Sequence, residues 1–229
     1  MVENGMKPIT DYQVYVVDMD GTLYYKRSMQ IKMAYRLLGY YLTHFHQIKE
    51  LFLLRDYRKL RDLEELSDKA DIEEIIQQKL SRKYRYSQEK VRRITEKWIL
   101  KRPLDILYQC RDKRLICFLD EARQNGKRVY IYSDYPAKDK CDALGICVDG
   151  LYWPDGKHIC VLKPSADALR YILDSNGADY AQVLMIGDRE EKDGCCAARA
   201  QVDYLILKTQ PVVRMLQYRK LSVGGDQNE

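Results

Sequence analysis

The stretch Val14-Tyr-Val-Val-Asp18-Met-Asp20-Gly-Thr22-Leu-Tyr24 decides the fold of this chain. Its first four residues predict a β-strand buried on both faces, and Gly21 lets the backbone leave that strand. Open α/β sheets bind their ligands at the carboxyl ends of such strands. Side chains alternate along an extended segment, so we expect Asp18 and Asp20 on the same side, where their charges repel unless a cation or a proton lies between them.

A divalent metal ion with a phosphate ligand would relieve this repulsion. One aspartate would then be free to attack phosphorus, and the other to handle a proton. The alternative is an acidic turn after a strand, because Asp and Gly favour turns wherever they occur.

Composition sets the outer bounds of the prediction. The chain has 229 residues, 46% of them hydrophobic, which is enough for one large domain or two small ones. No apolar run approaches the roughly 20 residues that span a bilayer, and residues 1–7 lack the apolar segment of a signal peptide. We therefore expect a cytoplasmic protein without a membrane partner. The seven cysteines lack the paired spacing of a zinc site and are expected to be reduced.

Charge is distributed unevenly along the chain. Residues 25–114 contain 23 Lys and Arg against 13 Asp and Glu, a net charge of +10, whereas the remainder has 16 against 21, a net charge of −5. Such a shift marks a candidate domain boundary at each end. Apolar residues recur there every three to four positions, which predicts helices at 31–42, 51–63, 71–80 and 88–100, with helix starts at 67–71 and at Ser87. Residues 25–114 are thus predicted to be an all-helical insert.

The rest of the chain alternates between strand and helix. Short β-rich runs at 129–132, 183–186 and 204–207 are separated by helical patterns, and Gly145 ends one of the helices. The helices are expected at 115–125, 138–144, 165–175 and 190–200. Repeated units of this length predict an α/β fold, in which a parallel sheet has helices on both faces. The predicted core comprises residues 1–24 and 115–229.

Polar residues follow two more of these strands. Ser133 and Asp188 each end a β-rich run, so they can converge with the two carboxylates of the first motif at one edge of the sheet. Taken singly, each has an ordinary explanation: Ser133 can be a turn residue, Lys163 a solvated lysine, and Asp193 a helix cap. All of them together are harder to explain in this way.

In this order, these motifs resemble the haloacid-dehalogenase-like (HAD) hydrolase superfamily. The resemblance covers roughly residues 12–24 and 115–208, and the matching pieces are Asp18-Met-Asp-Gly-Thr, Ser133, Lys163-Pro164 and Gly187-Asp188-x-x-x-x-Asp193. It implies a Rossmann-like three-layer core and identifies the helical insert as the family's cap. It also implies that Asp18 is a nucleophile that forms an aspartyl-phosphate and that Asp20 is the acid/base. The superfamily's dehalogenating members lack an acid/base at this second position, so Asp20 favours phosphoryl transfer.

The resemblance also implies ligands. Ser133 and Lys163 would hold the phosphoryl oxygens. Asp18, Asp188 and the main-chain carbonyl of Asp20 would bind Mg²⁺, with Asp193 supporting the metal or the lysine. Independently of the resemblance, exposed backbone amides after the first strand, such as that of Thr22, can donate to the transferring oxygens. One departure from the family pattern is Gln201, because a glycine commonly stands at this turn.

The insert is expected to select the substrate and to act as a lid that excludes water. Residues 55–61 and 82–86 are basic with interleaved tyrosines, a texture that suits a nucleotide, another polyanion or nucleic acid. The alternative is a solvated helix face whose long basic side chains cover the core of the insert. Residues 24–26, directly after the first motif, are expected to form a flap over the substrate.

Three functions are compatible with the sequence. The first is a Mg²⁺-dependent phosphatase acting on a small phosphorylated metabolite or a nucleotide. The second is a phosphomutase of the same superfamily, which would share every core residue. The third is a basic protein that binds nucleic acid or an acidic partner through its insert and keeps a vestigial core; the complete set of motif residues argues against it.

Overall fold

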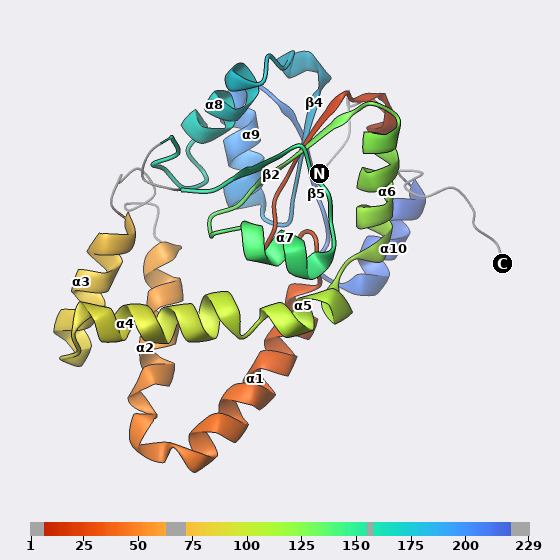
Figure 1. Ribbon diagram of the computed structural model, residues 1–229. Helices are drawn as coiled ribbons and strands as arrows, with labels where there is room; N and C mark the ends of the chain where they lie inside the picture. The colour runs from red at the N-terminus through yellow and green to blue at the C-terminus, as the bar shows by residue number, and fades with distance from the viewer. Residues whose placement is uncertain (1–6, 63–71, 155–157, 221–229) are drawn as a thin grey trace.

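The computed structural model describes residues 7–62, 72–154 and 158–220 and shows a five-stranded parallel sheet (Figure 1). The strands are β1 (Val14–Val17), β2 (Arg128–Tyr132), β3 (Gly150–Tyr152), β4 (Val183–Gly187) and β5 (Asp203–Ile206), in the spatial order β3-β2-β1-β4-β5. All four strand pairs are parallel. The prediction of an α/β, Rossmann-like fold is confirmed.

Strand β1 lies at the centre of the sheet, which explains why all four of its residues are apolar and buried. Val17 is in register with Ile131 of β2 and Ile186 of β4. The backbone N–H of Asp18 donates to the carbonyl of Ile186 at 2.8 Å, so this aspartate emerges between two strand ends. The residues that follow β1, β2 and β4 therefore share one edge of the sheet.

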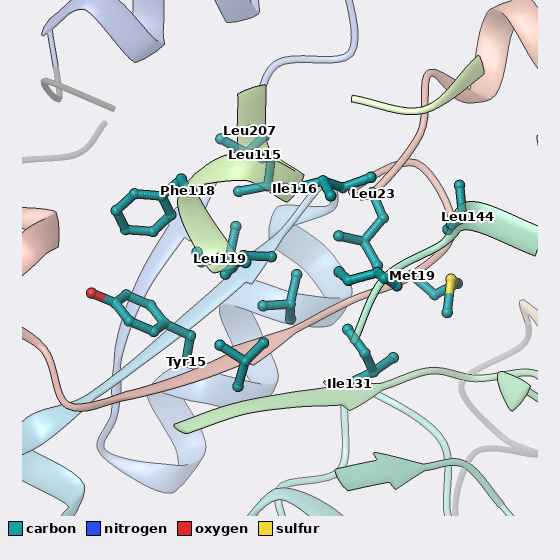
Figure 2. Packing of buried hydrophobic residues seen from close by; sticks show 14 of the residues in the cluster. Tyr15, Met19, Leu23, Leu115, Ile116, Phe118, Leu119, Ile131, Leu144 and Leu207 are labelled. Atoms are coloured by element: carbon teal, nitrogen blue, oxygen red, sulfur yellow. The ribbon is translucent and has the colours of Figure 1, made fainter. Parts of the chain in front are cut away.

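Helices cover both faces of the sheet. One face packs against α6 (Lys113–Gln124), α7 (Lys138–Leu144) and α10 (Pro211–Lys220), and the other against α8 (Asp167–Ser175) and α9 (Cys195–Ala200). Figure 2 shows Tyr15 of β1 beside Phe118 of α6; their rings meet edge to face with centroids 5.4 Å apart. Tyr15 and Val17 belong to this apolar cluster, whereas Val14 and Val16 belong to the cluster on the opposite face, as the alternation of strand side chains requires.

The insert is helical and has an apolar cluster of its own. Its elements are α1 (Lys26–Thr43), the 3-10 turn η2 (Phe45–Gln47), α2 (Lys49–Arg61), α3 (Ile72–Tyr84), α4 (Gln88–Thr95), the π-helical turn η4 (Glu96–Lys101) and α5 (Leu104–Cys110). Leu53, Ile76, Val91 and Trp98 are buried at its centre. Ser87 caps α4 by accepting a hydrogen bond from the Lys90 amide at 3.2 Å, which confirms that predicted helix start. The start predicted at 67–71 lies outside the described residues.

The two chain segments that join the insert to the core run side by side. The Tyr25 amide donates to the Cys110 carbonyl, and the Asp112 amide donates to the Leu23 carbonyl, both at 2.8 Å. Division of the chain into a core of residues 1–24 and 115–229 and an inserted domain of residues 25–114 remains a prediction.

Some elements differ from the sequence prediction. Strand β3 and helices α5 and α10 were not predicted, and neither were the 3-10 turns η1 (Ile9–Asp11) and η5 (Tyr180–Gln182). The helix expected at 190–200 begins with a π-helical turn, η6 (Glu190–Gly194), which continues into α9. The turn after α9 forms without glycine, because Gln201 itself adopts the left-handed conformation, with φ 60°. In the part of the chain that the structure describes, no helix combines the length and apolar character needed to cross a membrane.

Candidate active site

A cavity of about 250 Å³ lies where the carboxyl edge of the sheet faces the insert. Its core side is lined by Asp18, Asp20, Lys163, Asp188 and Asp193, and its other side by residues of α1, α2, η4 and α5. Five of the residues predicted to form the site therefore meet around one space, although they are far apart in the sequence.

Asp18 is held at both carboxylate oxygens. Its Oδ1 accepts a hydrogen bond from the Lys163 ammonium, and its Oδ2 accepts one from the Thr22 hydroxyl at 3.0 Å. Burial raises the pKa of Asp18 to about 7; the Lys163 charge opposes this rise, whereas the charges of Asp193 and Asp188 add to it. The neighbours of Asp18 thus orient its carboxylate, but burial and the nearby carboxylates disfavour its charged form.

Lys163 is the buried cation of the site. Its ammonium group contacts Asp18 Oδ1, Asp193 Oδ1 at 2.7 Å and the Tyr132 carbonyl at 3.3 Å. Burial disfavours the charged form, but Asp18 and Asp193 outweigh it and raise the pKa of Lys163 well above its ordinary value. The ammonium therefore stays protonated and places a fixed positive charge beside Asp18.

Three carboxylates could hold a metal ion. Asp18, Asp188 and Asp193 each offer an oxygen, and these oxygens all lie within 4.8 Å of one another. Carboxylate oxygens are the ligands that Mg²⁺ prefers. Burial raises the pKa of Asp188; the Lys26 charge opposes this rise, whereas the Asp193 charge adds to it. The donor set fits a hard divalent cation.

Two glycines allow these carboxylates to come close. A Cβ on Gly21, whose φ is +107°, would lie 2.1 Å from Oδ2 of Asp188. A Cβ on Gly187 would lie 2.3 Å from the side chain of Asp193. Asp193 also organises the loop after β4, because its Oδ2 accepts hydrogen bonds from the amides of Asp188 at 3.2 Å and Arg189 at 3.1 Å.

Asp20 has a different partner. Its carboxylate accepts two hydrogen bonds from the Lys140 ammonium, at 2.5 and 2.7 Å, and one from the Tyr24 hydroxyl. Burial alone would raise the pKa of Asp20, but the charge and hydrogen bonds of Lys140, together with the Tyr24 hydroxyl and the Lys26 charge, outweigh burial and the pKa is lowered. The Asp20 carboxylate is not one of the three that are grouped around the candidate metal site, and a role for its main-chain carbonyl there remains a prediction.

Lys140 was missed in the sequence, although the sequence carried a signal. Ala137, Lys140, Cys141 and Leu144 are all buried, and their spacing of i, i+3, i+4 and i+7 places them on one side of α7 and its N-cap. A lysine on the apolar stripe of a helix needs a buried partner. Its neighbour Lys138 is exposed and pairs with Asp142 on the surface of the same helix.

Two predicted residues are not among those that line the cavity. Thr22 and Ser133 are both fully buried. The Thr22 hydroxyl is engaged by Asp18, and Ser133 Oγ accepts a hydrogen bond from the Tyr135 amide at 3.1 Å. Asp134, which was not predicted, lines the cavity and accepts hydrogen bonds from the Lys163 amide at 3.1 Å and the Lys192 ammonium at 3.2 Å.

The insert contributes basic side chains to the cavity. Arg58 and Arg61 of α2 line it, so the first of the two basic stretches reaches the site. Arg61 is buried; it pairs with Glu73 at 2.5 Å, donates to the Asp134 carbonyl, and its guanidinium lies 4.3 Å from the centre of the Tyr135 ring.

Of the other contacts predicted for the insert, some reach the cavity and some do not. In the second basic stretch, Lys83 and Tyr84 bind Asp56 at 2.6 and 2.7 Å, away from the cavity. In the predicted flap, Tyr24 and Lys26 line the cavity, whereas the Tyr25 ring lies 5.2 Å from the Arg214 guanidinium.

A buried arginine from the last described helix fixes the turn after β1. Arg214 donates to the carbonyl oxygens of Gly21 at 2.7 Å and Thr22 at 3.0 Å, and pairs with Asp112 at 3.2 Å. This contact was not visible in the sequence, because α10 itself was not predicted.

A family model of haloacid dehalogenase-like hydrolases matches residues 12–200. The chain belongs to this family. No curated protein sequence matches it, but many solved structures of HAD proteins share its fold.

Three of these structures show how broad the family is. YfnB of Bacillus subtilis, described as a HAD-hydrolase bound to magnesium, is 15% identical with a TM-score of 0.58, over 93% of this chain and 99% of that one. L-2-haloacid dehalogenase of Xanthobacter autotrophicus is 15% identical with a TM-score of 0.58, over 94% and 85%. A Thermotoga maritima protein described as a β-phosphoglucomutase is 12% identical with a TM-score of 0.56, over 90% and 98%. At these identities the comparisons show the fold, and the chemistry must be argued from the site.

Proposed function

We propose that the protein is a Mg²⁺-dependent phosphatase that hydrolyses a small phosphorylated metabolite or a nucleotide through an aspartyl-phosphate on Asp18. The observation that carries this proposal is the second carboxylate, Asp20, which lines the same cavity as Asp18 but is held by a separate cation. Two carboxylates in different electrostatic environments can divide the roles of nucleophile and acid/base between them.

In the first step, an oxygen of Asp18 attacks phosphorus while the bond to the ester oxygen breaks. Lys163 places a positive charge beside the reacting carboxylate and the phosphoryl oxygens. When bound by Asp18, Asp188 and the main-chain carbonyl of Asp20, with Asp193 in support, Mg²⁺ would supply further positive charge against the anionic phosphate. Asp20 would protonate the departing oxygen.

In the second step, Asp20 would take a proton from water, which attacks phosphorus and releases inorganic phosphate from Asp18. The lowered pKa of Asp20 keeps it ionised and ready for this role as a base. Its role as an acid requires that the pair with Lys140 open, since a carboxylate held by two ammonium hydrogen bonds does not readily carry a proton.

The test is phosphate release from a panel of phosphorylated sugars, nucleotides and small acids, with Mg²⁺ and with a chelator. We expect metal-dependent release from one chemical class and none from an Asp18→Asn variant that remains folded. Near-wild-type turnover by that variant would exclude the mechanism. A requirement for a bisphosphate activator, with the phosphoryl group transferred to a sugar hydroxyl, would identify a phosphomutase instead.

A further inference from the structure

The outer surface of α1 is apolar where a surface helix should be polar. Ile31, Tyr35, Leu38 and Leu42 are all exposed, Tyr35 at 73% and Leu42 at 70%. At 3.6 residues per turn, these four positions fall within an arc of about 60°. They therefore form one continuous stripe along the helix.

This stripe is not the face that packs inside the protein. The buried residues of α1, Met33 and Tyr41, belong to the apolar cluster of the insert, and Met29 and Leu37 pack against that cluster. Helix α1 thus carries apolar residues on two opposite sides, although a helix on the surface of a protein normally has only one such side.

The apolar surface continues around the turn into α2. Phe45, Ile48 and Phe52 are exposed as well, Phe45 at 76%. Figure 1 shows α1 and α2 as the two arms of a V, whose apex at residues 44–48 points away from the sheet. Seven of the twelve large apolar side chains that are exposed in the described residues lie between positions 31 and 52. A concentration of this kind marks an interaction surface.

The exposed charged side chains of helices α1 and α2 all have one sign. Helix α1 contains no acidic residue, and the two acids of α2 before position 62, Glu50 and Asp56, are buried. The exposed charged side chains from 26 to 61 are Arg27, Lys32, Lys49, Arg55, Arg58 and Lys59. The partner of this surface must therefore be apolar and negatively charged.

We propose that the α1–α2 hairpin binds the surface of an anionic lipid bilayer, with its apex inserted among the headgroups. Leucine, isoleucine and aromatic side chains beside Lys and Arg are the composition of helices that lie in a membrane interface, and a convex apex can enter a bilayer where it could not fill a groove. A second copy of the chain is less favoured, because it would bring two surfaces of like charge together. The expectation of no membrane partner depended on the absence of a spanning segment, which peripheral binding does not need.

The experiment is sedimentation of the full-length protein with vesicles of phosphatidylcholine alone, or of phosphatidylcholine mixed with phosphatidylglycerol. We expect binding to the anionic vesicles only, and weaker binding when salt is raised from ~0.1 to ~0.5 M. The double variant Leu42→Gln, Phe45→Gln should lower the partition coefficient by more than about tenfold, since two large apolar side chains lose their burial. Lys49→Gln should lower it about fivefold.

Val212→Gln is the matched control. Val212 is an exposed apolar residue of α10, on the core, and its replacement should leave vesicle binding unchanged. Melting temperatures of all variants would show that each is folded. Failure of the wild-type protein to bind anionic vesicles, or equal binding by the double variant, would overturn the proposal. A third result would also overturn it: the wild type forms a dimer by light scattering, the double variant does not, and neither binds vesicles. A second copy of the chain would then cover this surface.

Discussion

At the scale of single residues, Asp18 and Asp20 show how two carboxylates one residue apart acquire different properties. Asp18 is buried and Asp20 half-buried, and each has a lysine partner. Burial, with the charges of Asp193 and Asp188 added to it, raises the pKa of Asp18, whereas the charge and hydrogen bonds of Lys140 help to lower the pKa of Asp20. The difference comes from the strand ends and helices around them, and not from the motif that contains both residues.

The first prediction concerns the pH dependence of stability. Because the pKa of Asp18 rises from 3.8 to about 7 on folding, the folded chain holds this proton more tightly than the unfolded chain. The contribution of Asp18 to the free energy of unfolding is fully present below about pH 4 and is lost as the pH rises to about 7. Asn resembles the protonated carboxyl, so Asp18→Asn should raise the Tm of the metal-free protein above that of the wild type at pH 8 but not at pH 4.

Thermal melting of both proteins across this pH range is the measurement. Mg²⁺ should raise the Tm of the wild type at pH 8 more than that of the variant, because a cation relieves the same repulsion among carboxylates. A Tm difference that does not grow with pH would contradict the environment assigned to Asp18.

The second prediction concerns Lys140. Lys140→Met removes the charge that holds the pKa of Asp20 down, so the acid limb of the pH–rate profile should move to higher pH by at least about one unit. The profile is best measured with p-nitrophenyl phosphate, whose leaving group needs no acid and isolates the base step. Lys138→Met is the matched control, since Lys138 lies on the same helix but is exposed and pairs with Asp142 instead of Asp20. An acid limb that stays in place would show that Asp20 is not the base.

At the scale of elements, sequence patterns were informative wherever a segment is long or buried on both sides. The central strand β1 and helices α1 to α4 of the insert were predicted because their apolar residues recur with a clear period. Strand β3 has three half-buried residues at the edge of the sheet, too short to show any period. Lys140 and Arg214 could not be paired with their partners from the sequence, because each contact joins segments about 100 residues or more apart.

The spacing of residues along the sequence also could not predict which polar side chains line the cavity. Ser133 ends its strand as the motif requires, yet its side chain is fully buried and does not line the cavity. Conversely, the turn residue Asp134 lines the cavity although it was not predicted. Arg61 lines it too, but the sequence marked this residue only as part of a basic stretch.

The third prediction tests the turn after α9. Gln201 adopts a left-handed backbone conformation. This conformation is unfavourable by about 1 kcal/mol or more for a residue with a Cβ, and a glycine avoids part of this penalty. Gln201→Gly should therefore raise the free energy of unfolding by up to about 1 kcal/mol, measured by urea denaturation. Gln124→Gly, at the last residue of α6 with ordinary helical geometry, should lower it. If Gln201→Gly were less stable than the wild type, contacts of the Gln201 side chain would stabilise the fold by more than the left-handed backbone destabilises it.

At the scale of the whole molecule, two consecutive residues join the insert to the core across the cavity. Arg61 donates to the Asp134 carbonyl from a buried position, and Asp62 pairs with Arg189 at 3.2 Å and Lys192 at 3.5 Å. Both lie at the end of α2, so one helix terminus holds the insert closed over the site. The Asp62 pairs are partly exposed, and such pairs contribute little to overall stability but can bias an equilibrium between closed and open arrangements.

The last prediction follows from this arrangement. Asp62→Asn should leave the Tm nearly unchanged but raise KM for the phosphorylated substrate about two- to fivefold, because the closed arrangement that completes the site becomes less populated. Salt screens the wild-type pairs, so the difference in KM between the two proteins should shrink at high ionic strength. Asp105→Asn is the matched control: Asp105 forms an equally exposed pair with Arg36, but both residues belong to the insert. Two results would contradict this prediction: equal changes of KM in both variants, or an effect of Asp62→Asn that persists in high salt. Closure would then not depend on the ion pairs of Asp62, and the contact of the buried Arg61 would remain as the link between insert and core.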